Sequence, residues 1–250
     1  MKILIIAGGF ATRMLLITEQ IPKCLIDING KPLIEHQLLE FRRQGFFDIV
    51  FCVAHLADKV KEYFGDGSNL SMNISYVQEA KELMGTAGSV KLTEELLSQD
   101  LDEDFIVFYG DNLCSMNFSD LLETHRNNQA FATMVIRPFP AGKVSSSVVE
   151  IDQNNEIITF LEKPEESIRE SYKEKETWNN NGIYILSKKV LSLIPEGEKY
   201  DFAHDLFPKI MEEHLGFYGY PCNGFYREIG RVEKYEKFLE EVKDKKNIFE

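Results

Sequence analysis

The sequence contains no long hydrophobic run. No stretch approaches the roughly 18 apolar residues that a membrane-spanning helix needs, and the apolar segment from Met1 to Ala7 is short and passes directly into a glycine turn. A secretory signal peptide has a longer apolar region and a cleavage site, so we expect this segment to form a buried strand. Apolar residues at 44% and charged residues at 28% are ordinary values for a globular protein. We therefore expect no membrane partner.

Cysteine pairs and positive charge are scarce as well. The four cysteines lie far apart, without C-x-x-C spacing, and they are too few for a disulfide scaffold. A reducing cytoplasm is therefore the expected location. A net charge of −13 argues against a nucleic-acid partner, because binding to a phosphate backbone needs clustered Lys and Arg. A phosphate ligand would need local counter-charges instead, which are usually a metal ion, oriented backbone amides and a few cations.

The histidines form no constellation. They are dispersed along the chain and indicate neither a zinc site nor a nucleophile and histidine pair. We expect each of them to be structural or exposed: His36, His55, His125, His204 and His214.

The first half of the chain alternates short β-rich runs with helical patterns, which is typical of βαβ units and a mostly parallel sheet. The predicted strands cover residues 2–7, 48–54, 73–78, 105–109 and 132–137. The predicted helices cover residues 32–45, 56–64, 86–97 and 118–127. A chain of this length can bury roughly three-quarters of its unfolded surface in one domain, so we predict a single domain over residues 1–250.

The second half changes style. Residues 147–152 and 156–162 flank an Asn-rich turn and predict an antiparallel hairpin. A strand over 178–186, a helix over 201–214 and a terminal helix from 231 to about 245 follow. The polar stretch 164–176 predicts an exposed loop or helix, with a lid over a site as the alternative. The fold class is therefore α/β, with a Rossmann-like mixed, mostly parallel sheet flanked by helices and a small antiparallel β extension.

The loop after the first strand is the first candidate site. Ala7, Gly8 and Gly9 follow that strand, at the sheet edge where open α/β folds bind ligands. Glycine lets main-chain N–H groups approach phosphate oxygens, while Thr12 adds a hydroxyl and Arg13 a permanently charged fork. Neither a G-x-G-x-x-G fingerprint nor a G-x-x-x-x-G-K-[ST] loop is present. Because a lone Gly-Gly pair is more often a simple turn, the loop alone leaves its function open.

The spacing of further motifs makes the interpretation specific. The segment from Ala7 to Met14, then Ile21-Pro22-Lys23, then Asn29 to Glu35 resembles the signature of the sugar-1-phosphate nucleotidylyltransferases, which reads G-G-x-G-T-R-L, P-K-P and G-K-P. The resemblance covers almost the whole chain and is greatest to the mannose- and heptose-1-phosphate guanylyltransferases. It implies a GT-A-like nucleotidyltransferase fold, with a nucleotide-binding half over 1–140 and a sugar-binding half with a C-terminal helix over 141–250.

The resemblance assigns the nucleotide side. It implies that Arg13 and Lys23 hold the nucleotide phosphates, and that the segments around Gln78 and from Leu83 to Ser89 read the base. Without the family, Lys23 would be a surface lysine and Gly85-Thr86 a helix start. The implied nucleotide-binding residues are Ala7, Gly8, Gly9, Thr12, Arg13, Lys23, Gln78, Gly85 and Thr86.

Metal and sugar residues come from later motifs. Asp111 follows a buried strand and takes the place of the family's first Mg²⁺ aspartate, and Mg²⁺ favours one or two carboxylates with phosphate oxygens. Glu228 stands where the family has its second metal aspartate. The Phe160 to Pro164 segment resembles F-x-E-K-P, which implies that Glu162 accepts from sugar hydroxyls and Lys163 meets the sugar phosphate. Asn180, in a segment resembling N-A-G-I-Y, would also bind the sugar.

Several positions depart from the family pattern. Ala11 replaces a glycine and would be strained if that residue needs a positive φ. Leu15-Leu16 replaces a stretch that usually carries an arginine and a proline. Ser147 replaces a sugar-contacting glycine, and Glu228 is one methylene longer than aspartate. These departures predict a less typical sugar site.

The implied reaction joins a nucleoside triphosphate, with GTP favoured, to a sugar 1-phosphate, with Mg²⁺ as cofactor and pyrophosphate as product. Arg13, Lys23 and Lys163 would carry the catalytic charge, since the nucleophile is already anionic and no general base is required. The product would serve nucleotide-sugar and cell-surface polysaccharide synthesis, and a homo-oligomer is allowed. Two alternatives stay open: a sensor that binds nucleotide sugars without chemistry, and a cytidylyltransferase acting on a non-sugar phosphate.

Overall fold

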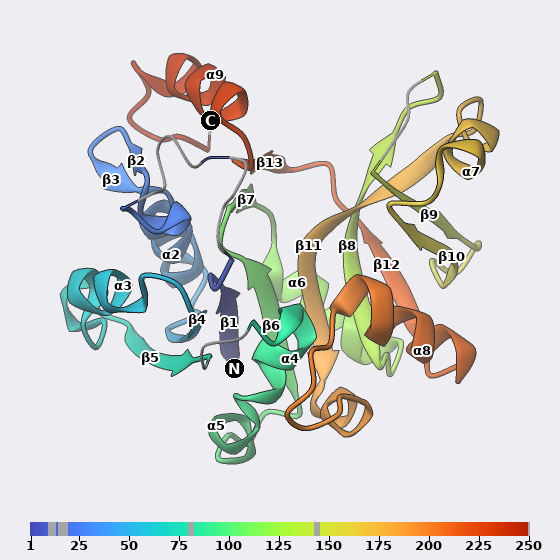
Figure 1. The fold of residues 1–250 in the computed structure, drawn as a ribbon, viewed down its shortest axis with the longest axis horizontal. Helices are drawn as coiled ribbons and strands as arrows, with labels where there is room; N and C mark the ends of the chain where they lie inside the picture. The colour runs from blue at the N-terminus through green and yellow to red at the C-terminus, as the bar shows by residue number, and fades with distance from the viewer. Residues whose placement is uncertain (10–13, 15–19, 80–82, 143–145, 250) are drawn as a thin grey trace. The chain divides into compact units, whose positions relative to one another are not determined.

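The computed structural model describes residues 1–9, 14, 20–79, 83–142 and 146–249 (Figure 1). The chain forms two compact units, each assembled from separate stretches of sequence. Unit 1 contains residues 1–83, 108–117 and 224–250, and unit 2 contains residues 84–107 and 118–223. In the part of the chain that is described, no helix is long and apolar enough to cross a membrane.

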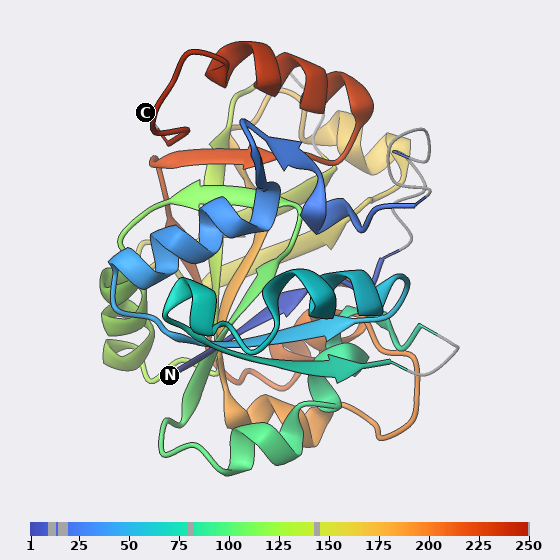
Figure 2. The same ribbon diagram turned by 90° about the vertical axis from the view of Figure 1, so that its left-hand side faces the viewer.

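Unit 1 is built on three parallel strands, which lie side by side in Figures 1 and 2. β1 (Lys2–Ile6) pairs in register with β4 (Asp48–Val53), and β4 pairs with β5 (Asn73–Gln78). The central residues of β1 and β4 are buried, as expected of runs rich in Ile, Val and Phe in a parallel sheet. Because the strands are parallel, the loops after their carboxyl ends meet at one edge.

The other elements of unit 1 surround this sheet. Helix α3 packs against β5 and helix α2 against β7, and α9 covers a core that also includes residues of the β2–β3 hairpin. The bounds are η2 (Lys23–Leu25), β2 (Asp27–Ile28), β3 (Lys31–Pro32), α2 (Leu33–Arg43), α3 (Ala57–Phe64), η3 (Ser68–Leu70), β7 (Asn112–Ser115), β13 (Phe225–Glu228) and α9 (Val232–Val242). The buried residues of α9 are Phe238 and Val242.

Unit 2 contains the antiparallel part of the molecule. β11 pairs antiparallel with β8 and β9, β10 pairs antiparallel with β9, and β12 is parallel to β8. The strands are β8 (Ala132–Phe139), β9 (Ser147–Ile151), β10 (Ile157–Glu162), β11 (Thr177–Ser187) and β12 (Phe217–Pro221), and β6 (Asp104–Tyr109) carries the chain from unit 2 into unit 1. The helices are α4 (Gly85–Lys91), α5 (Glu94–Ser98), α6 (Phe118–Asn127), α7 (Glu166–Ser171), η4 (Lys188–Leu193), η5 (Phe202–Leu206) and α8 (Phe207–Glu212).

The predicted fold class is confirmed: parallel strands with helices, joined to an antiparallel extension. The helix expected over 86–97 is in fact two helices, and the hydroxyl of Thr93 at the break donates to the Val90 carbonyl at 2.7 Å, a local bond that competes with helix continuation. The helix expected over 201–214 begins as a π-helix. Pro208 explains this start, because it has no N–H to donate to the carbonyl of His204. The sequence did not predict the short strands β2, β3, β7, β12 and β13.

Candidate active site

The end of β1 lies at the centre of the carboxyl edge of unit 1. The Ala7 N–H donates to the Cys52 carbonyl at 2.9 Å, and the Gly110 N–H donates to the Ile6 carbonyl at 3.0 Å. The loop after β1 therefore has the end of β4 on one side and the turn before Asp111 on the other. Gly9 is exposed on this edge. Thr12, Arg13, Ala11 and Leu15-Leu16 lie outside the described residues.

Glycine is required at position 8 because other segments of the same chain approach it closely. A Cβ atom at this position would lie 2.8 Å from Glu79 Oε1 and 3.3 Å from the Cβ of Ala54. Glu79 is itself buried, at the end of β5, so it has little room to move away. Only glycine fits this part of the loop without a shift of its neighbours, which leaves its main chain close to the sheet edge.

Lys23 and Asp111 come together at the same edge. Lys23 begins the short 3₁₀ turn η2 directly after Pro22, and its Nζ donates to Asp111 Oδ2. Their side chains are 15% and 24% exposed, so the pair can be reached by a ligand while being partly shielded from water. Burial, aided by the charge of Asp111, raises the pKa of the neighbouring Cys24 to about 12. Cys24 is therefore a neutral thiol at physiological pH and takes no charged part in the site.

Glu228 lies beside Asp111, although 117 positions separate them in the sequence. Strand β13 pairs antiparallel with β7 so that Glu228 is opposite Asn112, and the Ile229 N–H donates to the Asp111 carbonyl at 2.9 Å. A Cβ atom on Gly230 would overlap the Glu228 carboxylate, so that glycine provides the space the longer acidic side chain occupies. Glu228 Oε2 accepts from the Nζ of Lys234 on α9.

Asp111 and Glu228 are the carboxylates predicted to bind a divalent cation together with phosphate. Mg²⁺ binds through one or two carboxylates and completes its shell with phosphate oxygens and water. No group of three or more His, Cys, Asp or Glu residues is placed to hold a metal ion within the described ranges. Lys23 and Lys234 neutralise the two carboxylates in this structure.

The predicted base-reading residues lie in different units. Gln78, in unit 1, is exposed, and its Oε1 accepts from Lys61 at 2.7 Å. In unit 2, Gly85 has φ +75°, and a Cβ there would lie 2.5 Å from the Tyr200 carbonyl. The Thr86 hydroxyl donates to Asp201 Oδ2 at 2.7 Å. Gly85 and Thr86 are thereby fastened to the segment that begins η5, so the Thr86 hydroxyl has a structural partner.

Glu162 is the last residue of β10 in unit 2, and Lys163 follows it. Lys163 has φ +45°, a left-handed backbone that is uncommon outside glycine, and its side chain is 73% exposed against 17% for Glu162. The Lys163 Nζ lies 4.0 Å from Glu162 Oε1, a loose ion pair. Burial raises the pKa of Glu162, and the charges of Lys163 and His204 oppose that rise. Glu162 is thus a partly shielded hydrogen-bond acceptor, and Lys163 beside it is an exposed cation.

Asn180 is held in place on β11. Its Oδ1 accepts from the Gly182 N–H at 2.9 Å and from the Tyr184 hydroxyl at 3.0 Å, and its N–H donates to Ser147 Oγ at 3.1 Å. The pairing of β11 with β8 is irregular between Asn180 and Tyr184. Ser147 stands where the family has a glycine and is 2% exposed. Its hydroxyl helps to hold the Asn180 main chain in place.

The described residues of the predicted site are divided between the two units. Unit 1 holds Ala7, Gly8, Gly9, Lys23, Gln78, Asp111 and Glu228, and unit 2 holds Gly85, Thr86, Glu162, Lys163 and Asn180. Sequence reasoning missed Lys234, Asp201 and His204. Asp201 carried a signal, because an aspartate before a helical pattern is typical of a helix cap. Lys234 and His204 carried none, since only the folded chain places them beside Glu228 and Glu162.

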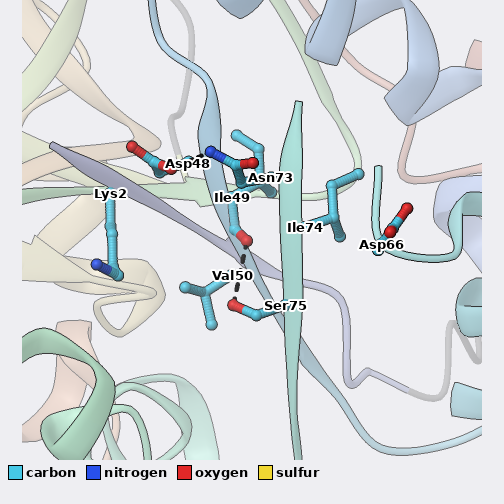
Figure 3. Close-up of a pocket in the computed structure, with 8 residues that line it drawn as sticks. All are labelled: Lys2, Asp48, Ile49, Val50, Asp66, Asn73, Ile74 and Ser75. Carbon is cyan, nitrogen blue, oxygen red and sulfur yellow. Dashed lines mark hydrogen bonds between the residues drawn. The ribbon is translucent and has the colours of Figure 1, made fainter. Parts of the chain in front are cut away.

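A separate cavity lies at the opposite, amino-terminal edge of the unit 1 sheet (Figure 3). Its volume is about 270 Å³, and its polar lining includes Lys2, Asp48, Asp66 and Asn73. Asp48 already accepts from the Asn73 amide at 2.8 Å. None of the predicted substrate-binding residues that the structure describes lines this cavity, so it is distinct from that part of the candidate site.

Comparison with known proteins identifies the family. A family model described as nucleotidyl transferase matches residues 2–245. The chain belongs to this family. The UTP–glucose-1-phosphate uridylyltransferase of Synechocystis sp. is 36% identical over 244 residues, which are 94% of this chain and 61% of that protein. The mannose-1-phosphate guanyltransferase of Yarrowia lipolytica is 31% identical over 235 residues, which are 92% of this chain and 61% of that protein.

Solved structures agree with the nucleotidyl transferase fold. The crystal structure of HddC from Yersinia pseudotuberculosis has a TM-score of 0.78 at 24% identity, covering 96% of this chain and 98% of that chain. The same protein in complex with GMP-PN has a TM-score of 0.76. The chain spans about three-fifths of the length of the two curated relatives. The family and the fold predicted from the motifs are thus confirmed, while the residue roles stay predictions.

Proposed function

We propose that this nucleotidyl transferase moves a nucleoside monophosphate from a nucleoside triphosphate to a sugar 1-phosphate and releases pyrophosphate. The observation that carries the proposal is the contact between Lys23 and Asp111 at the carboxyl edge of the sheet, next to the glycine loop after β1. A cation and a metal-binding carboxylate at one sheet edge suit a triphosphate and its Mg²⁺. The curated relatives are named as enzymes of this reaction type.

The reaction needs positioning and charge. A phosphate oxygen of the sugar 1-phosphate forms a bond to the α-phosphorus, and the bond from that phosphorus to the bridging oxygen of pyrophosphate breaks. Because both reactants are anions, the protein must offset their repulsion and stabilise the charge of the transition state. Lys23 would bind nucleotide phosphate, with Arg13 as a second cation, and Lys163 would hold the phosphate of the sugar. Mg²⁺, when bound by Asp111 and Glu228, would neutralise charge on the triphosphate.

Lys23 and Asp111 would exchange partners when substrate binds. In this structure each neutralises the other, which avoids a partly buried, uncompensated charge. A triphosphate with Mg²⁺ offers phosphate oxygens to the lysine and a cation to the aspartate, so both groups keep an opposite charge. The same exchange applies to Glu228, which Lys234 neutralises from α9.

For the nucleotide we propose GTP. The motif pattern favours guanylyltransferases, and the relative from Yarrowia lipolytica carries that name. The relative from Synechocystis sp. is named for UTP, so UTP is the competing choice. Pyrophosphate release should be measured for GTP, UTP, CTP and dTTP, each with glucose 1-phosphate and mannose 1-phosphate. The proposal for the base is wrong if UTP gives a kcat/KM above that of GTP.

A nucleotide-sugar sensor is the second candidate, because lysines form ion pairs with both carboxylates that are predicted to bind the metal. In a sensor the two ion pairs would persist when nucleotide sugar binds, and no pyrophosphate would form. The same panel separates the two functions, provided that nucleotide binding is followed by calorimetry. Binding without Mg²⁺-dependent pyrophosphate release supports the sensor, and release supports the transferase.

A further inference from the structure

The π-helix η5 presents a histidine that the motif analysis set aside as structural or exposed. Asp201 caps this helix, accepting from the Ala203 N–H at 2.9 Å and the His204 N–H at 3.3 Å. The Thr86 hydroxyl accepts from the Phe202 N–H at 3.0 Å and donates to Asp201. Single π-turns inside helices are rare and frequently occur at functional sites. Side-chain acceptors therefore hold the N–H groups of the first three residues of the helix, while the His204 side chain remains exposed.

Aromatic contacts fix α8 against β10 and η5 against β11. The Phe160 ring meets the Phe207 ring edge-on with centroids 5.6 Å apart, and the Tyr184 ring lies 5.4 Å from that of Phe202. Phe160 and Glu162 lie on the same face of β10, because side chains alternate along a strand. His204 lies on η5, three positions before Phe207, and η5 itself contacts β10. This contact brings the exposed His204 to the strand that ends at Glu162.

The charges around Glu162 support this placement. The charge of His204 acts on Glu162 and opposes the rise in its pKa, as Lys163 does, whereas Asp201 adds to the rise. Asp201 has its carboxylate oxygens committed to Thr86 and to the first turn of η5. Among the described residues, Lys163 and His204 are thus the exposed donors whose charges act on Glu162.

We propose that His204 is a further binding residue for the phosphorylated sugar, to which it donates a hydrogen bond beside Glu162. This inference rests on the proposed function. A ligand that carries both hydroxyls and a phosphate needs an acceptor and more than one donor at this point. Glu162 is the acceptor, and its negative charge together with that of Asp201 outweighs the charge of Lys163. A second donor from η5 adds a hydrogen bond to the anionic ligand that Lys163 alone does not supply.

The test compares His204→Ala and His204→Gln with His214→Asn. His214 is an exposed histidine of the same unit with φ +53°, a backbone that asparagine adopts readily. Binding of mannose 1-phosphate and glucose 1-phosphate is measured by calorimetry, and the KM values for sugar phosphate and nucleotide are measured by pyrophosphate release. Thermal melting checks that each variant is folded.

We expect His204→Ala to weaken sugar 1-phosphate binding about tenfold or more, the size of a lost hydrogen bond to a charged group. Its KM for nucleotide should change less than about twofold on the same basis. His204→Gln keeps an N–H donor and should recover most of the affinity, and His214→Asn should match the unaltered protein. An equal effect of His204→Ala and His214→Asn on sugar binding, or no binding by the unaltered protein, overturns the inference. Binding without pyrophosphate release overturns only the proposed function.

Discussion

Replacement of Lys23 by alanine tests the core of the candidate site. If Lys23 stabilises phosphate charge in the transition state, its loss should lower kcat about 100-fold, the usual effect of removing one such donor, which corresponds to about 2.7 kcal/mol. The apparent KM for sugar phosphate should change little. Pyrophosphate release under saturating nucleotide and sugar phosphate measures the effect directly.

The loss of stability in this variant is too small to imitate the loss of activity. Lys23 and Asp111 are partly exposed, at 15% and 24%, so their ion pair contributes about 1 kcal/mol or less, and the melting temperature should fall by about 2–4 °C. A protein with 5 kcal/mol of stability that loses 1 kcal/mol is still about 99.9% folded. A fall in kcat at full folding must therefore come from the site.

Lys91→Ala is the matched control. Lys91 is 17% exposed, forms a 2.7 Å ion pair with Glu94 and donates to the Leu191 carbonyl at 3.0 Å, so its removal disrupts comparable partly buried contacts outside the predicted catalytic residues. We expect the melting temperature of Lys91→Ala to fall by a similar amount, since its ion pair resembles other partly exposed pairs. Its kcat should stay within about twofold of that of the unaltered protein. Equal kcat values for Lys23→Ala and Lys91→Ala would refute the role of Lys23.

Three further substitutions test the other parts of the site. Lys163→Ala should raise the KM for sugar phosphate about tenfold, as expected for a lost charge-assisted bond, with a smaller change for nucleotide; equal changes in both KM values, measured by initial rates, would count against its role. Gly230→Ala should displace the Glu228 carboxylate, on which the new Cβ would fall, and raise the Mg²⁺ concentration needed for half-maximal rate; an unchanged Mg²⁺ titration would mean that Glu228 is not a ligand. Glu162→Gln should lower sugar affinity yet raise the melting temperature near pH 7. Burial raises the pKa of Glu162 above its ordinary value of 4.5, so the folded protein loses stability as the pH rises through the folded-state pKa. The higher melting temperature of Glu162→Gln should therefore disappear when the pH is below that ordinary value. A difference in melting temperature between the two proteins that stays constant with pH would contradict this account.

The sequence predicts the regular elements well because their signals are local. Strands such as Asn73–Gln78 and helices such as Phe118–Asn127 have the predicted bounds, since burial patterns of period two and 3.6 lie within each segment. The π-helix was missed because it depends on Pro208, whose effect falls on a bond four residues earlier. The pairing of β7 with β13 joins distant segments, and no local pattern reports it.

The candidate site divides in the same way. The resemblance supplied Lys23, Asp111, Glu162 and Lys163 in order along the chain, because motif spacing survives in sequence. Their immediate partners, such as Lys234 on α9, come from three-dimensional neighbours that carry no motif. His204 is the clearest case: the sequence shows only a dispersed histidine, and the contact of η5 with β10 brings it to the strand that ends at Glu162.

The C-terminal segment has a consequence for the order of folding during synthesis. The core around Ile28 and Leu33 is completed by Ile229, Phe238 and Val242, from a stretch that rejoins unit 1 after all of unit 2. Emerging from the ribosome, the first 83 residues would expose this apolar surface until α9 is made. Such long-range closure slows folding and leaves a partly folded chain prone to aggregation. Unit 1, and with it the pairing of β7 with β13, should therefore form only after α9 has left the ribosome.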